Sequence, residues 1–408
     1  MGKSIAQAVI GAGYGDEGKG HLVDALAAGA IGQPVVVRSN GGAQAGHTVT
    51  LPDGRRHVFH HVGSGALAGA STHLSRFFVH HPMLLDAERA AVAALGGCAD
   101  ITADPRGLVT TPWDMLINQA VERSRDGGRH GSCGLGFGET IERSLSPAFA
   151  LTVADLAGPA LRGRLQAIRV DWVKWRLTIL GVTSLSANEA RVLDDEGVLE
   201  VFLEDCRRFA GTVGQSSDAG LAARGPVIFE GAQGLLLDQA IGVFPHVTRS
   251  QTGLVNMVAI AREAGLEGIE ALYVTRAYAT RHGAGPLPGA VEALDEFDVV
   301  DPTNVPNAWQ GKIRYAPLDL DRLEGAIAAD RALCDPGSVA IRASLAVTCL
   351  DQARGHARLV DSGATVWRAP EALARAVSAR LSLALKAESW GPDRNGVRLR
   401  EPAVTLAA

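Results

Sequence analysis

Short apolar runs alternate with amphipathic stretches along most of the chain, which is the pattern of a parallel α/β sheet. The apolar residues Ala6–Ile10 lead through a glycine-rich loop into Gly18–Ala28, where apolar residues recur at helical spacing. Val35–Val37 is an uninterrupted apolar run, as expected for a strand that is buried on both faces. The start of the chain therefore predicts a strand, a glycine loop, a helix and a second strand.

The same alternation continues to the C-terminal part of the chain. We predict one domain over residues 1–408, with a large, mostly parallel central sheet flanked by helices. This α/β fold class is P-loop-NTPase-like, and its helical insertions form a helical subdomain at about 113–224. The pattern predicts strands at Arg76–Val79, Asp100–Thr102, Pro226–Glu230, Ile269–Thr275 and Val339–Leu350, and helical stretches at Met83–Leu95, Val153–Leu180, Glu189–Phe209, Leu254–Ala264, Leu320–Leu333 and Pro370–Leu385.

The composition argues against several classes of protein. Hydrophobic residues make up 47% of the 408 residues, which is enough for a sizeable core. The 39 Lys and Arg against 44 Asp and Glu give a net charge of −5, which argues against a nucleic-acid or membrane-surface partner. The five cysteines are scattered without a CxxC pair, which fits a reducing compartment. No apolar run approaches the ~20 residues of a membrane helix, and we expect a cytoplasmic protein.

The first glycine cluster has the chemistry of a phosphate-binding loop. A dinucleotide fingerprint would need Gly or Ala where Asp16 stands. A Walker A loop would need Ser or Thr after Lys19. A loop before a helix still offers N–H groups and a Lys to phosphate oxygens, and an acidic oxygen to Mg²⁺. This loop alone leaves open a capped helix start with solvated charges.

Three further polar clusters follow predicted strands. They are Asn40–Thr48 with His47, Phe229–Gly234, and Tyr278–Pro286 with Arg281. Ligands of open α/β sheets bind outside the carboxyl ends of the strands, where these clusters fall. Taken one at a time, each is equally consistent with an ordinary loop.

Together these segments resemble the adenylosuccinate synthetase family. The matching pieces occur in the family's order and span nearly the whole chain. They are Gly15–Gly20, Ala45–Thr48, Glu230–Gly234, Val247–Thr248, Thr280–Arg281 with Gly283–Pro286, Leu350–Asp351 and Gly391–Arg394.

The resemblance implies a carbon–nitrogen ligase of purine biosynthesis. The family joins the amino group of L-aspartate to C6 of a purine nucleotide monophosphate, IMP, after a nucleoside triphosphate, GTP, has phosphorylated O6. It implies that Asp16 takes the proton from purine N1 and ligates Mg²⁺ together with the Gly46 carbonyl. His47 would act as general acid, Lys19 would hold the triphosphate, and Gln233 would contact the base.

The resemblance also implies binding residues and an assembly. Lys312 and Arg314 would grip the aspartate carboxylates. Arg143 would reach the nucleotide of a neighbouring subunit, which implies a homodimer. The implied nucleotide-binding set is Gly15, Glu17, Gly18, Gly20, Gln44, Ser132, Cys133, Arg143, Thr248, Arg281, Asp351, Gly391 and Pro392.

The chain departs from the usual family pattern in its substrate-binding segments. Gln44 replaces Asn, and Ser132–Cys133 replaces a Thr pair. Asn304–Arg314 keeps two basic residues of an arginine-rich run, and Cys349 replaces a Lys. This form resembles the phage-type aminoadenylosuccinate synthetases, which leaves dGMP as an alternative purine and ATP or dATP as alternative donors. Asp16 favours IMP, and a non-catalytic nucleotide-binding regulator is the remaining alternative.

Overall fold

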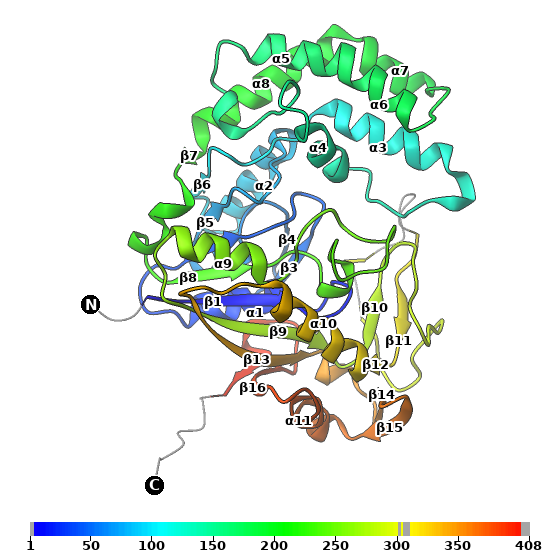
Figure 1. The fold of residues 1–408 in the computed structure, drawn as a ribbon. Helices are drawn as coiled ribbons and strands as arrows, with labels where there is room; N and C mark the ends of the chain where they lie inside the picture. Colours follow the sequence, from blue (N-terminus) through cyan, green and yellow to red (C-terminus); the bar gives the residue numbers. More distant parts are fainter. Residues whose placement is uncertain (1–3, 301–302, 305–310, 401–408) are drawn as a thin grey trace.

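A ten-stranded sheet forms the centre of the molecule in the computed structural model, which describes residues 4–300, 303–304 and 311–400 (Figure 1). Neighbouring strands are parallel throughout, except that the edge pair β16–β17 is antiparallel. The predicted large, mostly parallel sheet is confirmed. Its order is β17 (Val397–Leu399), β16 (Ala384–Ser389), β13 (Ala340–Thr348), β9 (Gly268–Arg276), β1 (Ile5–Gly11), β8 (Val227–Glu230), β2 (Val35–Arg38), β5 (Ser71–Leu74), β6 (Ile101–Ala103) and β7 (Gly214–Gln215).

Helices cover both faces of this sheet, and β1 shows why its sequence is apolar throughout. Val9 packs in one cluster with the apolar side of α1 (Lys19–Ala28). Ala8 and Ile10 point to the opposite face and pack in the cluster that contains α9 (Leu254–Glu263) and α10 (Leu320–Leu333). Successive side chains of a strand alternate between faces, so a strand with two covered faces needs apolar residues at every position.

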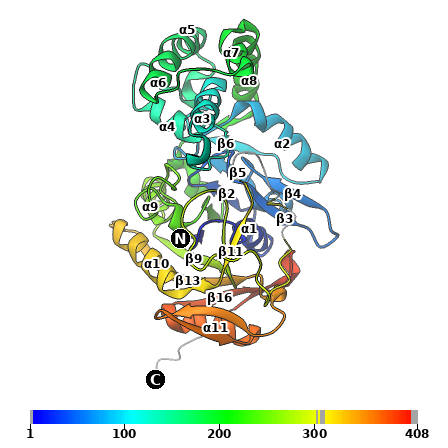
Figure 2. The same cartoon turned by 90° about the vertical axis from the view of Figure 1, so that its right-hand side faces the viewer.

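A helical layer stands at one end of the sheet, beyond β6 (Figures 1 and 2). Trp113 and Phe202 lie in its core, with ring centroids 6.4 Å apart. These helices fall within the predicted interval 113–224, but the end of that interval differs, because β7 extends the central sheet. The layer contains α3 (Pro112–Ser124), α4 (Phe137–Ser144), α5 (Leu161–Ala167), α6 (Val173–Ile179), α7 (Ala187–Asp194) and α8 (Glu196–Thr212), and α2 (Pro82–Ala94) packs against α8.

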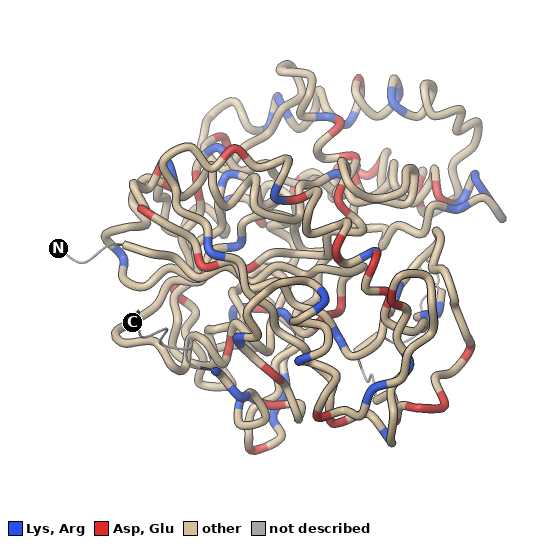
Figure 3. The backbone as a smooth tube through the Cα atoms, turned by 60° about the horizontal axis from the view of Figure 1, so that its bottom comes forward, with Lys and Arg blue, Asp and Glu red and all other residues tan. Residues whose placement is uncertain are grey.

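Three small sheets and one further helix complete the described elements. Acidic and basic residues are interspersed along the whole backbone (Figure 3), and many form ion pairs, such as Arg169 with Glu196 at 2.6 Å. Among the residues that the structure describes, no helix is both long enough and apolar enough to span a bilayer. The remaining elements are β3 (His47–Thr50) with β4 (Arg56–Phe59), β10 (Ala279–Arg281) with β11 (Arg314–Ala316), β12 (Leu318–Asp319) with β14 (Ala357–Asp361) and β15 (Ala364–Arg368), and α11 (Pro370–Leu381).

Three predicted elements are wrong in position or extent. The strand predicted at Arg76–Val79 is a turn that follows β5, and Arg76 there ion-pairs with Asp218 and Glu263. The helix predicted at 370–385 ends at Leu381, because Ser382 is left-handed with φ 51°. The long stretch 153–180 is broken into a short turn, α5, a π-helical turn and α6.

Candidate active site

A cavity of about 880 Å³ opens at the carboxyl ends of the central strands. Strands β9, β1, β8 and β2 are consecutive in the sheet, so the loops that follow them meet at one edge. The helical layer contributes the opposite wall through α3 and α4. Thirteen of the predicted site residues line this one cavity: Gly15, Asp16, Gly18, Lys19, Gly20, Gln44, Gly46, His47, Ser132, Cys133, Gln233, Thr248 and Arg281.

The glycine loop after β1 adopts a backbone that explains its composition. Gly15 and Gly18 have φ angles of 92° and 86°, in the left-handed region that favours glycine. Asp16 lies between them with φ 62°, which Asp tolerates better than most residues. Its carbonyl oxygen accepts a hydrogen bond from Nε of Arg276. The loop is therefore held in one conformation, with Asp16 on the cavity wall.

Gly20 allows α1 to approach β3. A Cβ atom at Gly20 would lie 2.9 Å from Cβ of His47 and 2.8 Å from Oγ of Ser64. Real Cβ atoms do not approach other atoms this closely, so the contact requires glycine. The absence of a side chain at this position brings His47 next to the glycine loop.

His47 is bound to a buried carboxylate for which the sequence analysis assigned no role. Its Nδ1 lies 2.5 Å from Oε1 of Glu230 at the end of β8, and Glu230 also accepts from N and Oγ of Ser64. Both His47 and Glu230 are buried, and Nε2 of His47 has no hydrogen-bond partner among the described residues. His47 lines the cavity, so Nε2 is the imidazole nitrogen that can bind a ligand there.

The protonation of this pair follows from its surroundings. Burial lowers the pKa of His47 to about 4, against the opposing charge of Glu230, and Arg38 and Lys19 lower it further. Burial alone would raise the pKa of Glu230, but His47, Arg38 and the hydrogen bonds together lower it to about 2. At neutral pH the pair is therefore a neutral imidazole that donates Nδ1–H to an ionised carboxylate.

Arg38 supplies the fixed positive charge beneath this pair. It is fully buried, and it is the register partner of Glu230 between β2 and β8. Its guanidinium lies 5.4 Å from the ring centroid of Phe78, a cation–π contact. The sequence shows only that Glu230 and Arg38 each end an apolar strand. Their spacing along the chain does not show that the two strands are neighbours.

The roof of the cavity is a loop of the helical layer. Ser132 accepts a hydrogen bond from Nδ2 of Asn118 on α3 at 2.8 Å. Burial raises the pKa of the Cys133 thiol, so the thiol stays protonated at neutral pH. A Cβ at Gly131 would lie 2.7 Å from N of Ala284, which shows how closely the roof meets the loop after β10.

Two predicted arginines brace that loop. Arg281 donates to the carbonyls of Pro286 and His246 at 2.8 and 2.9 Å, and its guanidinium lies 4.6 Å from the ring centroid of Tyr14. Arg314 donates to the carbonyls of Gly283 and Gly285, both at 2.8 Å. Arg281 lines the cavity, whereas Arg314 is not among its lining residues.

Arg143 lies inside the helical layer. Its side chain is fully buried and forms two hydrogen bonds with Asp114, at 2.9 and 3.0 Å. Its remaining donors bind the carbonyls of Phe149 and Val109. Four of the five N–H donors of the guanidinium are thus bonded within this chain, and Arg143 is not among the residues that line the cavity.

Other predicted residues lie outside the cavity lining. The side chain of Glu17 is buried behind the glycine loop, and Glu17 is not among the residues that line the large cavity. Lys312 is exposed, and residues 305–310 of the predicted aspartate segment lie outside the described residues. Asp351, Gly391 and Pro392 follow β13 and β16, farther along the same edge of the sheet.

Charged pairs missed by the sequence analysis line the wall formed by the helical layer. Arg176 on α6 binds Glu139 at 2.7 Å and Glu142 at 3.4 Å, both on α4. Arg249, which follows Thr248 in the loop after β8 and lines the cavity, forms an ion pair with Glu142 on α4. These contacts join the helical layer to the sheet.

Comparison with known proteins agrees with this geometry. The chain is 34% identical over 307 residues to the adenylosuccinate synthetase of Bordetella pertussis, covering 73% of this chain and 66% of that protein. It is 33% identical over 296 residues to that of Anaeromyxobacter dehalogenans, covering 71% and 65%. The alignments thus span just under two thirds of the length of these curated relatives.

Two structures share the fold over nearly the whole chain. Fully ligated adenylosuccinate synthetase from Plasmodium falciparum has a TM-score of 0.72 at 17% identity, covering 97% of this chain and 100% of that one. Succinoaminodeoxyadenylate synthetase of cyanophage S-2L has a TM-score of 0.61 at 17% identity, covering 98% and 96%. The sequence model for adenylosuccinate synthetase matches residues 8–302. Since this match covers well over half of the chain, the protein belongs to the adenylosuccinate synthetase family.

Proposed function

We propose that this protein is a carbon–nitrogen ligase that joins the amino group of L-aspartate to C6 of a purine nucleotide monophosphate, with IMP as the first candidate. The observation that carries the proposal is that Asp16, Lys19, His47 and Gln233 line one cavity. Its volume of about 880 Å³ lies in the range of sites for nucleotide-sized ligands.

The chemistry proceeds in two steps, because an oxo group at C6 is a poor leaving group. In the first, Asp16 takes the proton from N1 while O6 attacks the terminal phosphorus of the triphosphate, which releases the nucleoside diphosphate. In the second, the aspartate amine attacks C6, the C6–O bond breaks, phosphate leaves and the amine nitrogen gives up a proton to solvent. Nε2 of His47 contacts the phosphoryl group in transfer and donates a proton to it as it departs.

The oxygen donors on the cavity wall fit Mg²⁺. The carboxylate of Asp16 and the carbonyl of Gly46 are hard ligands of the kind that this ion prefers, and both residues line the cavity. We propose that they hold the ion. When bound, Mg²⁺ neutralises charge on the phosphate oxygens. The chain's own contribution is Lys19 with the amides of Gly18 and Gly20, which hold the triphosphate.

The monophosphate would place its phosphate under the roof loop. Gln44, Ser132, Cys133 and Thr248 line that part of the cavity. Arg249 is the neighbouring cation, and we assign to it the role first given to Arg143. Gln233 has a left-handed backbone with φ 65°, and a polar side chain held at such a position is suited to reading the base.

The remaining predicted residues would act at the edges of the site. Asp351, Gly391 and Pro392 lie along the sheet edge on the far side of the glycine loop, where the base of the triphosphate can extend. Lys312 and Arg314 are the two basic residues of the predicted aspartate segment, and we propose that they grip the aspartate carboxylates. The homodimer and a cytoplasmic location remain parts of this proposal.

A panel of purified-enzyme assays tests the proposal. IMP, dIMP, GMP and dGMP are each supplied with aspartate, Mg²⁺ and either GTP or ATP, and phosphate release and succinylated product are measured. Turnover of IMP confirms the first candidate.

Turnover confined to dGMP would establish the alternative with a 2-amino purine, which the few basic residues of Asn304–Arg314 favour. The cyanophage protein of the same fold was studied with dGMP and with dATP as energy donor. Nucleotide binding with no turnover of any pair would leave the non-catalytic regulator.

A further inference from the structure

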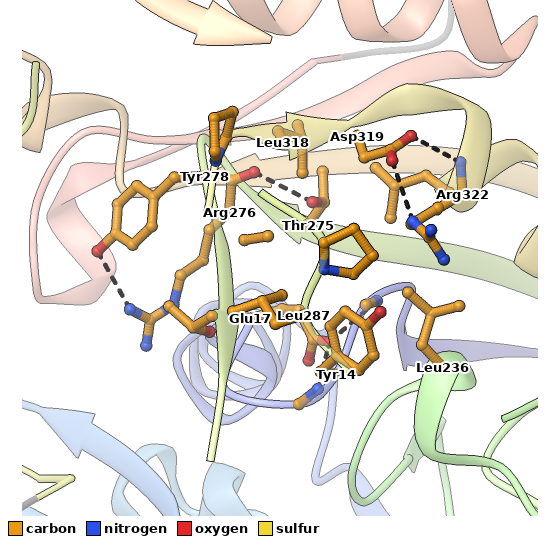
Figure 4. Close-up of a pocket in the computed structure, with 17 residues that line it drawn as sticks. Tyr14, Glu17, Leu236, Thr275, Arg276, Tyr278, Leu287, Leu318, Asp319 and Arg322 are labelled. Carbon is orange, nitrogen blue, oxygen red and sulfur yellow. Dashed lines mark hydrogen bonds and ion pairs between the residues drawn. The ribbon is translucent and has the colours of Figure 1, made fainter. Parts of the chain in front are cut away.

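Glu17 lies on the opposite side of the glycine loop from its neighbours. Asp16 and Lys19 line the large cavity, and Glu17 does not. Its side chain instead borders a small cavity of about 30 Å³ that is also lined by Tyr14, Leu236 and Thr275 (Figure 4). The side chain of Glu17 is therefore placed behind the loop that is proposed to bind the triphosphate.

The carboxylate of Glu17 binds the groups that an incoming phosphate would be expected to use. Oε1 accepts hydrogen bonds from the backbone amides of Gly13 at 3.0 Å and Gly15 at 2.8 Å. Oε2 accepts from Nζ of Lys19 at 2.6 Å. The two side chains are only 3% and 4% exposed, so this ion pair is shielded from water. Inside the protein such a charge-assisted contact is strong.

The surrounding glycines fit this carboxylate closely. A Cβ at Gly11 would lie 2.3 Å from Oε2, and a Cβ at Gly234 would lie 2.6 Å from Oε1. A side chain at either position would displace the carboxylate. Gly11 at the end of β1 and Gly234 in the loop after β8 therefore enclose the carboxylate of Glu17 and hold it in place.

A Lys ammonium has three donors, of which Glu17 takes one. The other two remain for groups in the large cavity, whose wall Lys19 forms. Without Glu17, the buried ammonium of Lys19 would lack its counter-charge and would favour a different rotamer. Glu17 thus fixes the position of the Lys19 ammonium.

We infer that Glu17 is a positioning residue and not a nucleotide ligand. It acts as an internal anion that holds Lys19 and the amides of Gly13 and Gly15 from behind the loop. The phosphate groups of a nucleoside triphosphate then meet Lys19 and the amides that follow Glu17, at the start of α1. This inference rests on only one part of the proposed function, the binding of a nucleoside triphosphate to this loop.

Glu17→Gln is the informative substitution, because it changes the charge with almost no change in shape. The amide oxygen of Gln can still accept from Gly13 and Gly15, but its NH₂ group cannot accept from Lys19. Calorimetric titration of the full chain with Mg²⁺–GTP and Mg²⁺–ATP should show affinity about tenfold weaker, as expected for a lost charge-assisted bond. Affinity for IMP or dGMP should stay within about twofold.

A double-mutant cycle separates action through Lys19 from direct contact. In the Lys19→Met background, Glu17→Gln should have little further effect on triphosphate affinity, because the residue through which it acts has gone. Additive losses would mean that Glu17 contacts the nucleotide itself, and would overturn the inference. Unchanged triphosphate affinity in Glu17→Gln alone would overturn it as well.

Asp330→Asn is the matched control for a general loss of stability. Asp330 is a buried carboxylate that accepts from the amide of Leu254 and the hydroxyl of Tyr273, and it does not line the large cavity. It should lower the melting temperature without a selective effect on the triphosphate. If Glu17→Gln weakens both nucleotides equally and behaves like this control, the inference is wrong.

The test is also distinct from that of the ligase. A wild-type chain that binds triphosphate but forms no product would refute ligation and leave the role of Glu17 to be decided by the cycle. A wild-type chain that binds neither triphosphate would overturn both.

Discussion

The protonation of His47 determines when it can act. With its pKa lowered to about 4 by burial, the imidazole is neutral at pH 7 and presents the lone pair of Nε2 to the cavity. A general acid needs the opposite state. An entering phosphate supplies negative charge beside the ring and raises its pKa, because the charged form then gains a partner on each side. Glu230 is already in place as the second partner, at 2.5 Å.

Glu230→Gln tests this coupling. Gln keeps a hydrogen-bond acceptor for Nδ1–H but cannot stabilise the imidazolium, so kcat should fall about 10- to 100-fold while KM for the monophosphate changes little. Asp16→Ala and His47→Ala should each cost about 10²-fold or more with the fold intact. Steady-state kinetics with circular dichroism measure both effects. Near-full activity in Glu230→Gln would remove the carboxylate from the mechanism.

Buried histidines make the fold sensitive to acid. Burial is the main cause that lowers the pKa of His80 and His81 to about 3, and that of His21 to about 4. The unfolded chain binds these protons near pH 6.5 and the folded chain does not. Stability is therefore lost as pH falls from about 6.5 towards 4, by up to about 1.4 kcal/mol per pH unit for each histidine.

His81→Leu measures how much one buried histidine contributes to the loss of stability at low pH. Both ring nitrogens of His81 lack a hydrogen-bond partner among the described residues, so the substitution removes no such bond. Urea unfolding at pH 7.5 and pH 5 should show a smaller loss of stability in His81→Leu than in wild type. His356→Leu, at an exposed position, should lose as much as wild type. An equal loss in all three proteins would show that other groups govern acid unfolding.

At the scale of elements, the sequence predicted the strands and helices whose buried faces are apolar. Strands β1 and β8 and helix α1 were found because their burial on the sheet requires apolar runs or helical spacing. Strand β5 was missed because it buries polar residues. His73, for example, is fully buried and satisfied by Thr102 and Asp218, at 3.0 Å each. Such partners come from distant segments, which no local pattern reports.

In the site, too, local sequence patterns predict some residues and miss others. The residues of the strand-end loops could be predicted, since the topology of a parallel sheet brings such loops together. The partners of those residues could not, because they depend on the register between strands. Glu230 beside His47 and Arg38 beneath it follow from the pairing of β2 with β8. The partner of Arg143 is likewise distant in sequence, since Asp114 lies on another helix.

Gly20 tests how an element positions the site. Gly20→Ala would place a methyl group against Cβ of His47 and Oγ of Ser64, forcing α1 and β3 apart at a cost of about 1–3 kcal/mol. Activity should fall more than stability does, because His47 moves with β3. Gly163→Ala in exposed α5, where no described atom lies within 4 Å of the new Cβ, should instead gain about 0.5–1 kcal/mol. Thermal unfolding with kinetics separates the two, and equal behaviour would contradict the contact.

At the scale of the whole molecule, two parts of one chain enclose the cavity: the helical layer and the central sheet. Glu142 of α4 accepts from Arg176 within the helical layer and from Arg249 on the sheet side. Arg143 is enclosed within the layer, bonded to Asp114. The described structure therefore offers Arg249 as a phosphate-binding cation that belongs to the same chain as His47. We therefore expect each subunit to supply the phosphate-binding cation of its own site.

Mixing two inactive variants decides whether subunits share the site. His47→Ala and Arg249→Ala chains are combined in equal amounts, unfolded together and refolded, and ligase activity is compared with that of each variant alone. If Arg249 serves the site of its own chain, the mixture should be no more active than the sum of its parts. If it instead served a neighbour's site in a two-fold dimer, mixed dimers would regain one intact site, about a quarter of wild-type activity overall. Recovery of that size would mean that the phosphate cation is supplied across the subunit interface.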